Sequence, residues 1–227
     1  MFKSLLNLFF PKTCSGCSSY LTANETIICT TCRHDIPLTN HYLNQENEAF
    51  KKFYGRVAVR HVSCFVYFHK KGIVQEMIHN LKYRGHEEVG SLLGNWYAED
   101  LKLVPELTSA TCIIPVPLHK RKLRERGYNQ VATFGKALST QLSLPYNDKV
   151  LIRKVYSKTQ SKKNLLGRTE GIQSTFDVNF TTDDHNKHFL LIDDVITTGA
   201  TLEACSKALL KIPGASISIV CMAMTES

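Results

Sequence analysis

A stretch of 13 residues, FLLIDDVITTGAT at 189–201, combines two adjacent acids with a run of small side chains. Small residues let backbone N–H groups approach an anion, and a helix N-terminus adds partial positive charge, so the run predicts a phosphate cradle. Two carboxylates beside a phosphate would repel it unless the ligand also offers hydroxyl groups or a divalent cation. A ribose 5-phosphate meets this requirement, with its 2- and 3-hydroxyls on Asp193 and Asp194. An ordinary strand-to-helix turn with an acidic cap would explain one Asp and one Thr, but not the whole stretch.

Four cysteines near the N-terminus form two Cys-x2-Cys pairs: Cys14, Cys17, Cys29 and Cys32. Each pair suits a turn that aims both sulfurs at one ion, and four thiolates make a closed zinc site of the structural kind. The spacing predicts such a site, with redox pairs or a disulfide framework as the alternatives. Because this segment is too short to bury a core of its own, zinc would contribute much of its folding free energy. We interpret the segment as a scaffold for the rest of the chain, with protein docking and nucleic-acid contact left open.

The chain has a formal net charge of +8, and the excess positive charge lies in one central segment. Residues 117–170 hold 13 Lys and Arg against 3 Asp and Glu, whereas the remainder holds 15 basic and 17 acidic residues. Such a segment indicates a polyanionic partner. Single-stranded nucleic acid would fit, with phosphates on Lys and Arg and bases stacked on Tyr83 or Tyr128. A solvated surface is the alternative, and Tyr128 can equally pack.

The pattern of apolar residues predicts strands that alternate with helices. The strands are expected at 57–68, 111–117, 149–155, 188–194 and 216–224, and the helices at 73–85, 87–103, 128–142 and 201–212. Such alternation is typical of an α/β fold with a largely parallel sheet, in which ligands bind beyond the carboxyl ends of the strands. We expect a four-cysteine zinc-binding module at 1–38, a linker or hood-like segment at 39–56, and the α/β domain at 57–227.

The N-terminus contains no predicted signal peptide. Its apolar run at 5–10 is short and interrupted by Asn7, and no small-residue cleavage site follows. No stretch of the chain approaches the roughly 20 apolar residues of a membrane span. We interpret the first residues as a short amphipathic helix and expect a cytoplasmic protein.

Several of these segments resemble one known family. LLIDDVITTGAT is similar to the phosphoribosyl pyrophosphate (PRPP) loop of the type I phosphoribosyltransferases. The cysteine pairs, LKYRG at 81–85, PVPLHKRKLRERGYNQ at 115–130 and the stretch 153–176 extend the resemblance over nearly the whole chain, to the ComF competence-protein family. That family joins a four-cysteine zinc head, similar to a zinc ribbon, to a phosphoribosyltransferase-like domain. The resemblance implies the same type I phosphoribosyltransferase fold for this chain.

The resemblance also implies roles for particular residues. Asp193 and Asp194 would bind the ribose hydroxyls and, in an active enzyme, stabilise the transition state. The 5-phosphate would lie on Thr197, Thr198, Gly199, Ala200 and Thr201, and the pyrophosphate on Pro115, Val116, Pro117, Arg121 and Arg126. Magnesium would arrive with PRPP, and residues 153–176 would match the flexible loop that closes over the substrate.

Two functions follow from these residues and this resemblance. The first is a PRPP-binding protein of the competence machinery that assists DNA uptake and the handling of single-stranded DNA in natural transformation, alongside a helicase-type partner. The alternative is an active phosphoribosyltransferase that displaces pyrophosphate from PRPP with an unidentified acceptor. The sequence presents the ligand half of an enzyme but no evident acceptor site, whose hood would have to come from residues 40–80 or from the C-terminus.

Overall fold

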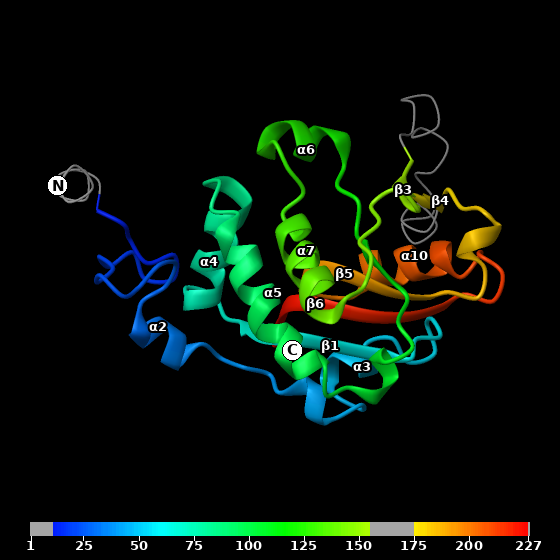
Figure 1. Ribbon diagram of the computed structural model, residues 1–227, viewed down its shortest axis with the longest axis horizontal. Helices are drawn as coiled ribbons and strands as arrows, with labels where there is room; N and C mark the ends of the chain where they lie inside the picture. Colours follow the sequence, from blue (N-terminus) through cyan, green and yellow to red (C-terminus); the bar gives the residue numbers. More distant parts are fainter. Residues whose placement is uncertain (1–10, 155–174, 227) are drawn as a thin grey trace.

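The computed structural model describes residues 11–154 and 175–226, and its centre is a four-stranded sheet (Figure 1). The strands are β1 (His61–Phe68), β2 (Cys112–Pro115), β5 (His188–Ile196) and β6 (Ser216–Thr225). Their order is β1-β6-β5-β2, and every neighbouring pair is parallel. Strands of such a sheet are apolar on both faces, because helices cover both sides. The predicted α/β fold with a largely parallel sheet is confirmed.

Three helices cover one face of the sheet: α4 (Ile73–Tyr83), α5 (Glu88–Leu101) and α7 (Val131–Leu142). Their buried side chains share one hydrophobic core with Leu190 and Ile192 of β5. Helices α5 and α7 approach each other closely, because α5 carries Gly90 and Gly94 at the contact. A Cβ atom on Gly94 would lie 2.8 Å from the Cβ atom of Ala137, so an alanine there would push the helices apart.

The opposite face of the sheet is covered by α10 (Ala200–Leu209) and by the short helix α3 (Glu48–Lys51). Leu202 of α10 lies in a second hydrophobic core, together with Phe189 and Leu191 of β5. The side chains of β5 therefore alternate between the two cores, as they must in a strand that is buried on both faces.

The cysteine-bearing N-terminal segment packs against the α4 side of the domain. It contains α2 (Thr30–Asp35), and its Ile28 belongs to the same core as Val74 of α4. The side chain of Asn80 in α4 donates to the buried carbonyl of Ser15 at 2.9 Å. Apolar and polar contacts thus both attach this segment to the domain.

Residues 39–56 are folded against the edge strand β1. They contain the 3-10 turn η1 (His41–Leu43) and α3. Asn47 caps α3 by accepting from the amide of Phe50 at 3.0 Å, and it donates to the carbonyl of Val62 in β1 at 2.8 Å. One side chain therefore both starts the helix and fixes it to the sheet.

A second, small sheet has two antiparallel strands, β3 (Leu151–Arg153) and β4 (Phe176–Val178). The sequence predicts the first strand but not its partner, because three residues are too few to show a period. Residues 155–174 lie outside the described residues, and with them most of the stretch that the resemblance assigns to a closing loop. Two 3-10 turns, η2 (Pro105–Leu107) and η3 (Thr182–Asp184), connect other elements.

Strand β1 is shorter than predicted. It begins at His61 rather than at Val57. The amides of Arg56 and Val57 both bond back to the carbonyl of Phe53, so the chain here belongs to the turn after α3. A local run of β-branched residues cannot reveal this competing hydrogen bonding.

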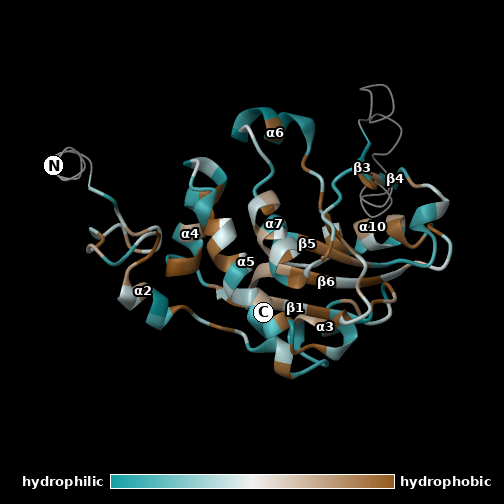
Figure 2. Ribbon diagram, in the orientation of Figure 1, coloured by the Kyte–Doolittle hydropathy of each residue, from teal (hydrophilic) through white to brown (hydrophobic). Residues whose placement is uncertain are grey.

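Helix α6 (Lys120–Arg126) is not predicted by the sequence, which shows no apolar period there. His119 caps it by accepting from the amide of Arg121 at 3.2 Å, and Gly127, with a φ of 80°, ends it. Arg121 and Glu125 form an ion pair one turn apart, at 2.7 Å. None of its side chains is buried, and Figure 2 shows the helix mostly in the colour of hydrophilic residues.

Residues 1–10, for which the sequence predicts an amphipathic helix, lie outside the described residues. Within 11–154 and 175–226, no helix combines the length and the apolar character that a membrane crossing requires.

Candidate functional site

The acid pair lies near the carboxyl end of β5, and the strand continues past it to Ile196. β2 ends at Pro115, opposite Ile192, so beyond that point no described strand pairs with the β2 side of β5. Asp193 is paired with β6 on the other side. Strand pairing on this side therefore stops before Asp194 and the following loop, at the carboxyl end of β5 where ligands bind in sheets of this kind.

The loop after β5 encloses a hollow of about 50 Å³ at the N-terminus of α10. It is lined by Asp193, Val195, Ile196, Thr197, Thr198, Gly199, Ala200, Thr201 and Leu202, and so brings together all five residues predicted for the phosphate. Gly199 has a φ of 76°, and a Cβ atom there would lie 3.1 Å from the ring of Phe53. A space lined by small residues at the start of a 10-residue helix suits an anion, because the amides of the first helical turn and the positive end of the helix dipole meet there.

Arg56 fastens this loop to the segment before β1. Its guanidinium donates to the carbonyl of Thr198 at 2.9 Å and to that of Lys52 at 2.8 Å. It also makes two hydrogen bonds to the Glu203 carboxylate in α10, at 2.8 and 2.5 Å. Sequence reasoning missed Arg56, because a single arginine 142 residues before its partner leaves no local signal.

The two carboxylates of the acid pair face opposite sides of the sheet. Asp194 faces α4 and α7, where its Oδ2 atom lies 2.9 Å from Lys82 Nζ and 2.5 Å from Gln130 Nε2. Asp193 lines the loop hollow and accepts the backbone N–H of Asp194 at 2.9 Å. Successive strand residues point to opposite faces, so a sugar that contacts both acids would have to lie across the open edge of β5.

The negative charge of the acid pair is largely offset within the protein. Burial and the neighbouring Asp194 carboxylate raise the pKa of Asp193 far above its usual range, which favours the neutral form of this carboxyl. Lys82 forms an ion pair with Asp194 in which the two side chains are 20% and 11% exposed. An anion in the loop hollow therefore meets much less repulsion than two free carboxylates would exert. No role for Lys82 or Gln130 is predicted from the sequence. The one sequence feature that could have indicated a role is that these residues lie in LKYRG and PVPLHKRKLRERGYNQ, two of the segments that carry the family resemblance.

The first three residues predicted for the pyrophosphate lie where β2 ends. Pro115 is the last residue of β2, and the amide of Val116 donates to the carbonyl of Ile192 in β5 at 2.9 Å. Pro117 then leads toward α6. The turn is thereby held beside the carboxyl end of β5, within reach of a ligand on the loop.

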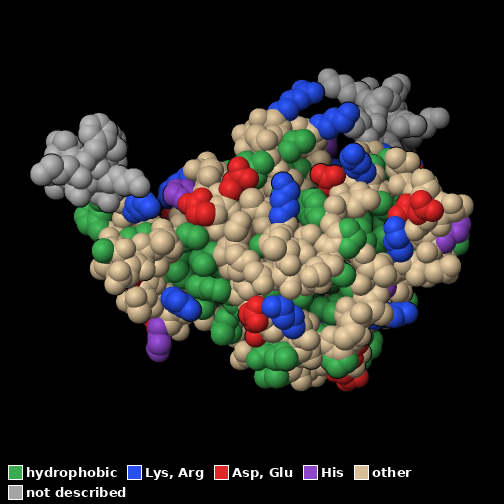
Figure 3. Space-filling view, in the orientation of Figure 1, with side chains coloured by type: hydrophobic (Ala, Val, Ile, Leu, Met, Phe, Trp, Pro, Cys, Tyr) green, Lys and Arg blue, Asp and Glu red, His purple; other side chains and the backbone are tan. Residues whose placement is uncertain are grey.

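The two predicted arginines lie on α6 but have different surroundings. Arg121 pairs with Glu125, and both side chains are mostly exposed. Arg126 donates to Gln130, which in turn donates to Asp194. Among the contacts of the described residues, Arg126 is connected to the acid pair through Gln130, whereas Arg121 has no such connection. Lys and Arg side chains project from the region of α6 at the top of Figure 3.

A second hollow, of about 190 Å³, lies between the end of α4 and α6, and we call it the α4–α6 hollow. It is lined by Lys82, Tyr83, Gly85, Lys122, Glu125, Arg126 and Tyr128. Tyr83 is 64% exposed, and the Arg126 guanidinium lies 5.0 Å from its ring centroid. The Tyr128 hydroxyl donates to the carbonyl of Leu81, and its ring packs against the core. Of the two aromatic residues predicted to stack on bases, Tyr83 is exposed and Tyr128 is packed.

The later part of the basic segment is described at its start alone. Arg153 lies over the ring of Phe176, 5.2 Å from the centroid, and Lys154 pairs with Asp177 at 2.6 Å. The other Lys and Arg residues in this part of the basic segment lie outside the described residues; they are Lys158, Lys162, Lys163 and Arg168.

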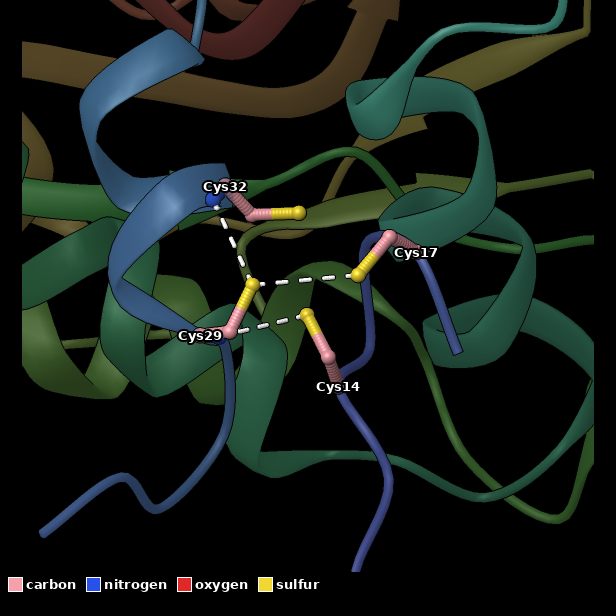
Figure 4. Close-up of side chains that lie close together, drawn as sticks. All are labelled: Cys14, Cys17, Cys29 and Cys32. Atoms are coloured by element: carbon pink, nitrogen blue, oxygen red, sulfur yellow. Dashed lines mark hydrogen bonds between the residues drawn. The ribbon is translucent and has the colours of Figure 1, made fainter. Parts of the chain in front are cut away.

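The four N-terminal cysteines come together in one cluster (Figure 4). Their Sγ atoms all lie within 4.8 Å of one another, and those of Cys17 and Cys29 are 3.7 Å apart. The Cys14 sulfur accepts the N–H groups of Gly16 and Cys29, at 3.3 and 3.2 Å. The Cys29 sulfur accepts that of Cys32 at 3.4 Å. All four thiols are free in the described chain, and together they form a ligand set that can hold a metal ion.

Comparison with protein families places the loop in a known domain. The family model described as "Phosphoribosyl transferase domain" matches residues 131–226. The matched region runs from α7 to the end of β6 and contains the acid pair, the loop and α10. The predicted phosphoribosyltransferase fold, with an N-terminal four-cysteine cluster beside it, is confirmed.

Curated relatives extend the similarity beyond that domain. Competence protein F of Haemophilus influenzae is 32% identical over 114 residues, which cover 50% of this chain and 50% of that protein. DNA utilization protein YhgH of Escherichia coli O157:H7 is 26% identical over 152 residues, 66% of each chain. Competence protein ComFC of Bacillus subtilis is 28% identical over 211 residues, 91% of this chain and 82% of that protein. The matched part of this chain thus spans half of the first relative, just under two thirds of the second, and most of the third.

Proposed function

Because the chain belongs to the ComF family, we propose that it binds PRPP at the loop after β5 and assists the handling of single-stranded DNA during transformation. The observation that carries the proposal is the loop hollow, which lies beside two carboxylates whose charge is already offset. A hollow of this kind accepts a phosphate, and the carboxyl groups add partners for hydroxyl groups of the same ligand.

A phosphorylated sugar uses both parts of this site. The 5-phosphate lies at the start of α10, where the helix dipole favours an anion. The carboxyl groups of Asp193 and Asp194 accept hydrogen bonds from the sugar hydroxyls. Inorganic phosphate has no sugar hydroxyls to donate to the acids, so these acceptors beside the loop favour a sugar phosphate over a bare anion.

The diphosphate of PRPP would extend toward residues 115–117, and Lys82 and Arg126 are cations whose contacts lead to the acid pair, Lys82 directly and Arg126 through Gln130. Magnesium would enter with the ligand, since it is bound mainly through phosphate oxygens and water in such sites. The proposed ligand therefore accounts for the acids, the loop and the turn after β2 together.

The nucleic-acid part of the proposal rests on α6 and on the relatives. Two of the relatives are named competence proteins and a third a DNA utilization protein. The helix α6 is exposed and rich in Lys and Arg, and the exposed Tyr83 ring lies beside it. Cations that follow a backbone and an aromatic ring that stacks on a base are the features of single-strand binding. The helicase-type partner and the cytoplasmic location remain predictions from the sequence.

We also propose that the four-cysteine cluster holds a structural zinc ion. With Zn–S bonds of about 2.3 Å, sulfurs of a tetrahedral site lie about 3.8 Å apart. The 3.7 Å between the sulfurs of Cys17 and Cys29 agrees with that spacing. Four protein ligands leave no position open for a substrate, so the ion would stabilise the segment that packs on α4.

An active phosphoribosyltransferase is the alternative, and the same loop and acids would serve it. An acceptor would form a bond to the anomeric carbon of PRPP while the bond from that carbon to the pyrophosphate oxygen breaks. The electron pair leaves with pyrophosphate, whose charge the basic residues and magnesium would stabilise. Release of pyrophosphate in the presence of an acceptor distinguishes this function from binding alone.

The test is calorimetric titration of PRPP with magnesium into the wild type and into the double variant Asp193→Asn with Asp194→Asn. We expect the double variant to bind about 100-fold more weakly or not at all, because hydrogen bonds to charged groups contribute on the order of 1.5–3 kcal/mol each. The matched control is Asp183→Asn, an exposed acid in η3, which should leave the affinity unchanged. Equal affinity in the double variant and the wild type would contradict the proposed site.

A further inference from the structure

A continuous set of side-chain contacts links the basic helix α6 to the acid pair. The Arg126 guanidinium donates to the Tyr83 hydroxyl at 3.3 Å and to Gln130 Oε1 at 2.7 Å. Gln130 Nε2 donates to Asp194 Oδ2 at 2.5 Å, and Lys82 Nζ lies 2.9 Å from the same oxygen. Gln130, at the start of α7, and Lys82, in α4, therefore both connect the α4–α6 hollow with the carboxyl end of β5, and of these two Gln130 is the one that also holds Arg126.

Gln130 is 5% exposed, and both ends of its amide are in use. Its oxygen faces a guanidinium and its nitrogen faces a carboxylate. Rotation of the amide by half a turn would set donor against donor and acceptor against acceptor. A buried polar group that loses one of its hydrogen-bond partners is destabilised. If Asp194 stops accepting from Gln130, the Gln130 amide therefore reorients, and its hydrogen bond with Arg126 changes as well.

We propose that Gln130 is a positioning residue that couples the two ligand sites, so that a sugar phosphate on the loop after β5 strengthens the binding of single-stranded DNA at α6. This inference rests on the proposed function, because it takes those two ligands at those two places. What it adds is the direction of their dependence and the residue that transmits it.

The direction follows from competition for one carboxylate. Without a ligand, Gln130 holds Arg126 against the ring of Tyr83. Sugar hydroxyls that donate to Asp194 compete with Gln130 Nε2 for its oxygen, and the displaced amide reorients to find another acceptor. Arg126 is then released to pair with a DNA phosphate, and the Tyr83 ring is free to stack on a base. The effect is reciprocal, so DNA also strengthens the binding of the sugar phosphate.

PRPP itself is a poor probe of this coupling. Its diphosphate can compete with DNA phosphates for Lys82, Lys122 and Arg126, which line the α4–α6 hollow. That competition opposes the effect transmitted by Gln130. Ribose 5-phosphate has the 5-phosphate and the 2- and 3-hydroxyls but no diphosphate, so it isolates the coupling.

The experiment measures the affinity of the full chain for a fluorescent oligothymidylate of about 20 nucleotides, by anisotropy at fixed salt, with and without saturating ribose 5-phosphate. We expect the sugar phosphate to tighten binding by about five-fold or more in the wild type. We call the oligonucleotide affinity with ribose 5-phosphate, divided by the affinity without it, the affinity ratio. Methionine has a similar length to glutamine but cannot bridge Arg126 and Asp194, so in Gln130→Met this ratio should fall to one. Each ligand should still bind this variant on its own.

Two further variants make the result specific. Gln141→Met makes the same change on the exposed end of α7, where Gln141 donates to Asn95 at 3.2 Å, and it should keep the wild-type ratio. Gln130→Asn keeps an amide but is one methylene too short to reach both partners, so it should lose the ratio as Gln130→Met does. Thermal unfolding of each variant establishes that it is folded, and the shorter amide serves if the methionine variant does not fold.

Three results would overturn the inference. If both ligands bind the wild type but the ratio is one, or the oligonucleotide binds more weakly, the coupling is absent while the proposed function stands. If both Gln130 variants keep the wild-type ratio, another residue transmits the coupling. If ribose 5-phosphate does not bind the wild type, the coupling fails, whereas the proposed function fails only if PRPP or the oligonucleotide does not bind.

Discussion

The loop after β5 and the basic helix α6 are held in opposite ways. The loop is fixed from beneath, by the Arg56 bonds to Thr198 and Glu203 and by the Phe53 ring against Gly199. Helix α6 buries none of its side chains and is stabilised mainly by its caps and an exposed ion pair. The first region is therefore a preformed site for one small ligand, whereas the second presents charge to a partner without a fixed shape.

This difference separates the forces that would govern the two ligands. Binding at the loop depends on buried supports, so substitutions far from the ligand should weaken it. Binding at α6 depends on exposed charge, so it should respond to salt and tolerate substitution without loss of stability. The predictions below test that separation, from the largest expected effect to the smallest.

Among single substitutions, the largest effect on stability is expected from the loss of the metal cluster. Cys32→Ser, or removal of the ion with a chelator, should lower the free energy of unfolding by on the order of 5 kcal/mol, because metal binding and folding of this segment are coupled. The cysteine segment packs on α4, which carries Lys82 and Tyr83, so oligonucleotide binding should weaken more than sugar-phosphate binding. Metal analysis, thermal unfolding and the two binding assays measure these effects.

Cys112→Ala is the control for that variant, since Cys112 is an equally buried cysteine outside the cluster. It should lower the free energy of unfolding by about 1 kcal/mol and leave the metal in place. A cluster variant that unfolds no more easily than this control would contradict a structural role for the ion.

The next effect concerns acid. Burial lowers the pKa of His41, His61 and His188 to about 4 each, against 6.5 for an unperturbed histidine. The unfolded chain then binds more protons than the folded chain between pH 6.5 and 4, so stability should fall as the pH falls through this window. Each shift is worth on the order of 3 kcal/mol when complete. Asp193 acts in the opposite direction, because its pKa is raised in the folded chain, but it is one group against three.

Denaturant unfolding at a series of pH values measures this slope. In His188→Asn, one of the three groups no longer titrates. The slope of the free energy of unfolding against pH should therefore decrease by the amount that corresponds to about one bound proton. His188→Asn should leave the pH dependence of the affinity for ribose 5-phosphate as it is in the wild type, because His188 stands at the amino end of β5, away from the loop. A slope of zero between pH 6.5 and 4 would contradict the burial of these rings.

A smaller effect is expected from the support of the loop. Arg56→Met removes the bonds to Thr198 and Glu203, and it should weaken PRPP binding by about ten-fold, in line with the loss of one charge-assisted hydrogen bond. Oligonucleotide binding should be unchanged. Arg60→Met is the matched control, because Arg60 bonds to Ser109 at the other end of β1. Equal losses for both ligands would show that the loop and α6 are not supported separately.

The smallest effect on stability is expected from substitutions that remove positive charge from α6. Replacing Lys120, Arg121 and Lys122 by Gln should reduce the dependence of oligonucleotide affinity on salt by about 0.7 logarithmic units for each lost phosphate contact. The free energy of unfolding should change by less than about 0.5 kcal/mol, because these side chains are exposed. Lys136→Gln, on exposed α7 surface, should change neither quantity. A salt dependence that is the same in the triple variant would place DNA elsewhere.

The same contrast explains which parts of the molecule the sequence could predict. The acid pair, the small residues after it and the cysteine pairs are local patterns in which the type and order of residues carry the chemistry. The alternation of strands and helices is local as well, and the parallel sheet follows from it. These features were accessible because no distant residue is needed to define them.

The remaining features depend on residues that are far apart in the chain. Arg56 reaches Thr198 across 142 positions, and Gln130 reaches Asp194 across 64, so neither contact has a sequence pattern. The ion pair of Asp194 with Lys82 and the raised pKa of Asp193 both follow from burial and packing. Helix α6 was not predicted, because it buries no side chains and so has no apolar face that would produce a helical period in the sequence.

The most direct test of the account is a crystal structure of the protein with PRPP and magnesium. We predict the 5-phosphate in the loop hollow, within hydrogen-bonding distance of residues 197–201, and the sugar hydroxyls at Asp193 and Asp194. Density for the ligand on α6 with the loop hollow empty, or no density at saturating PRPP, would contradict the assignment of this loop as the sugar-phosphate site.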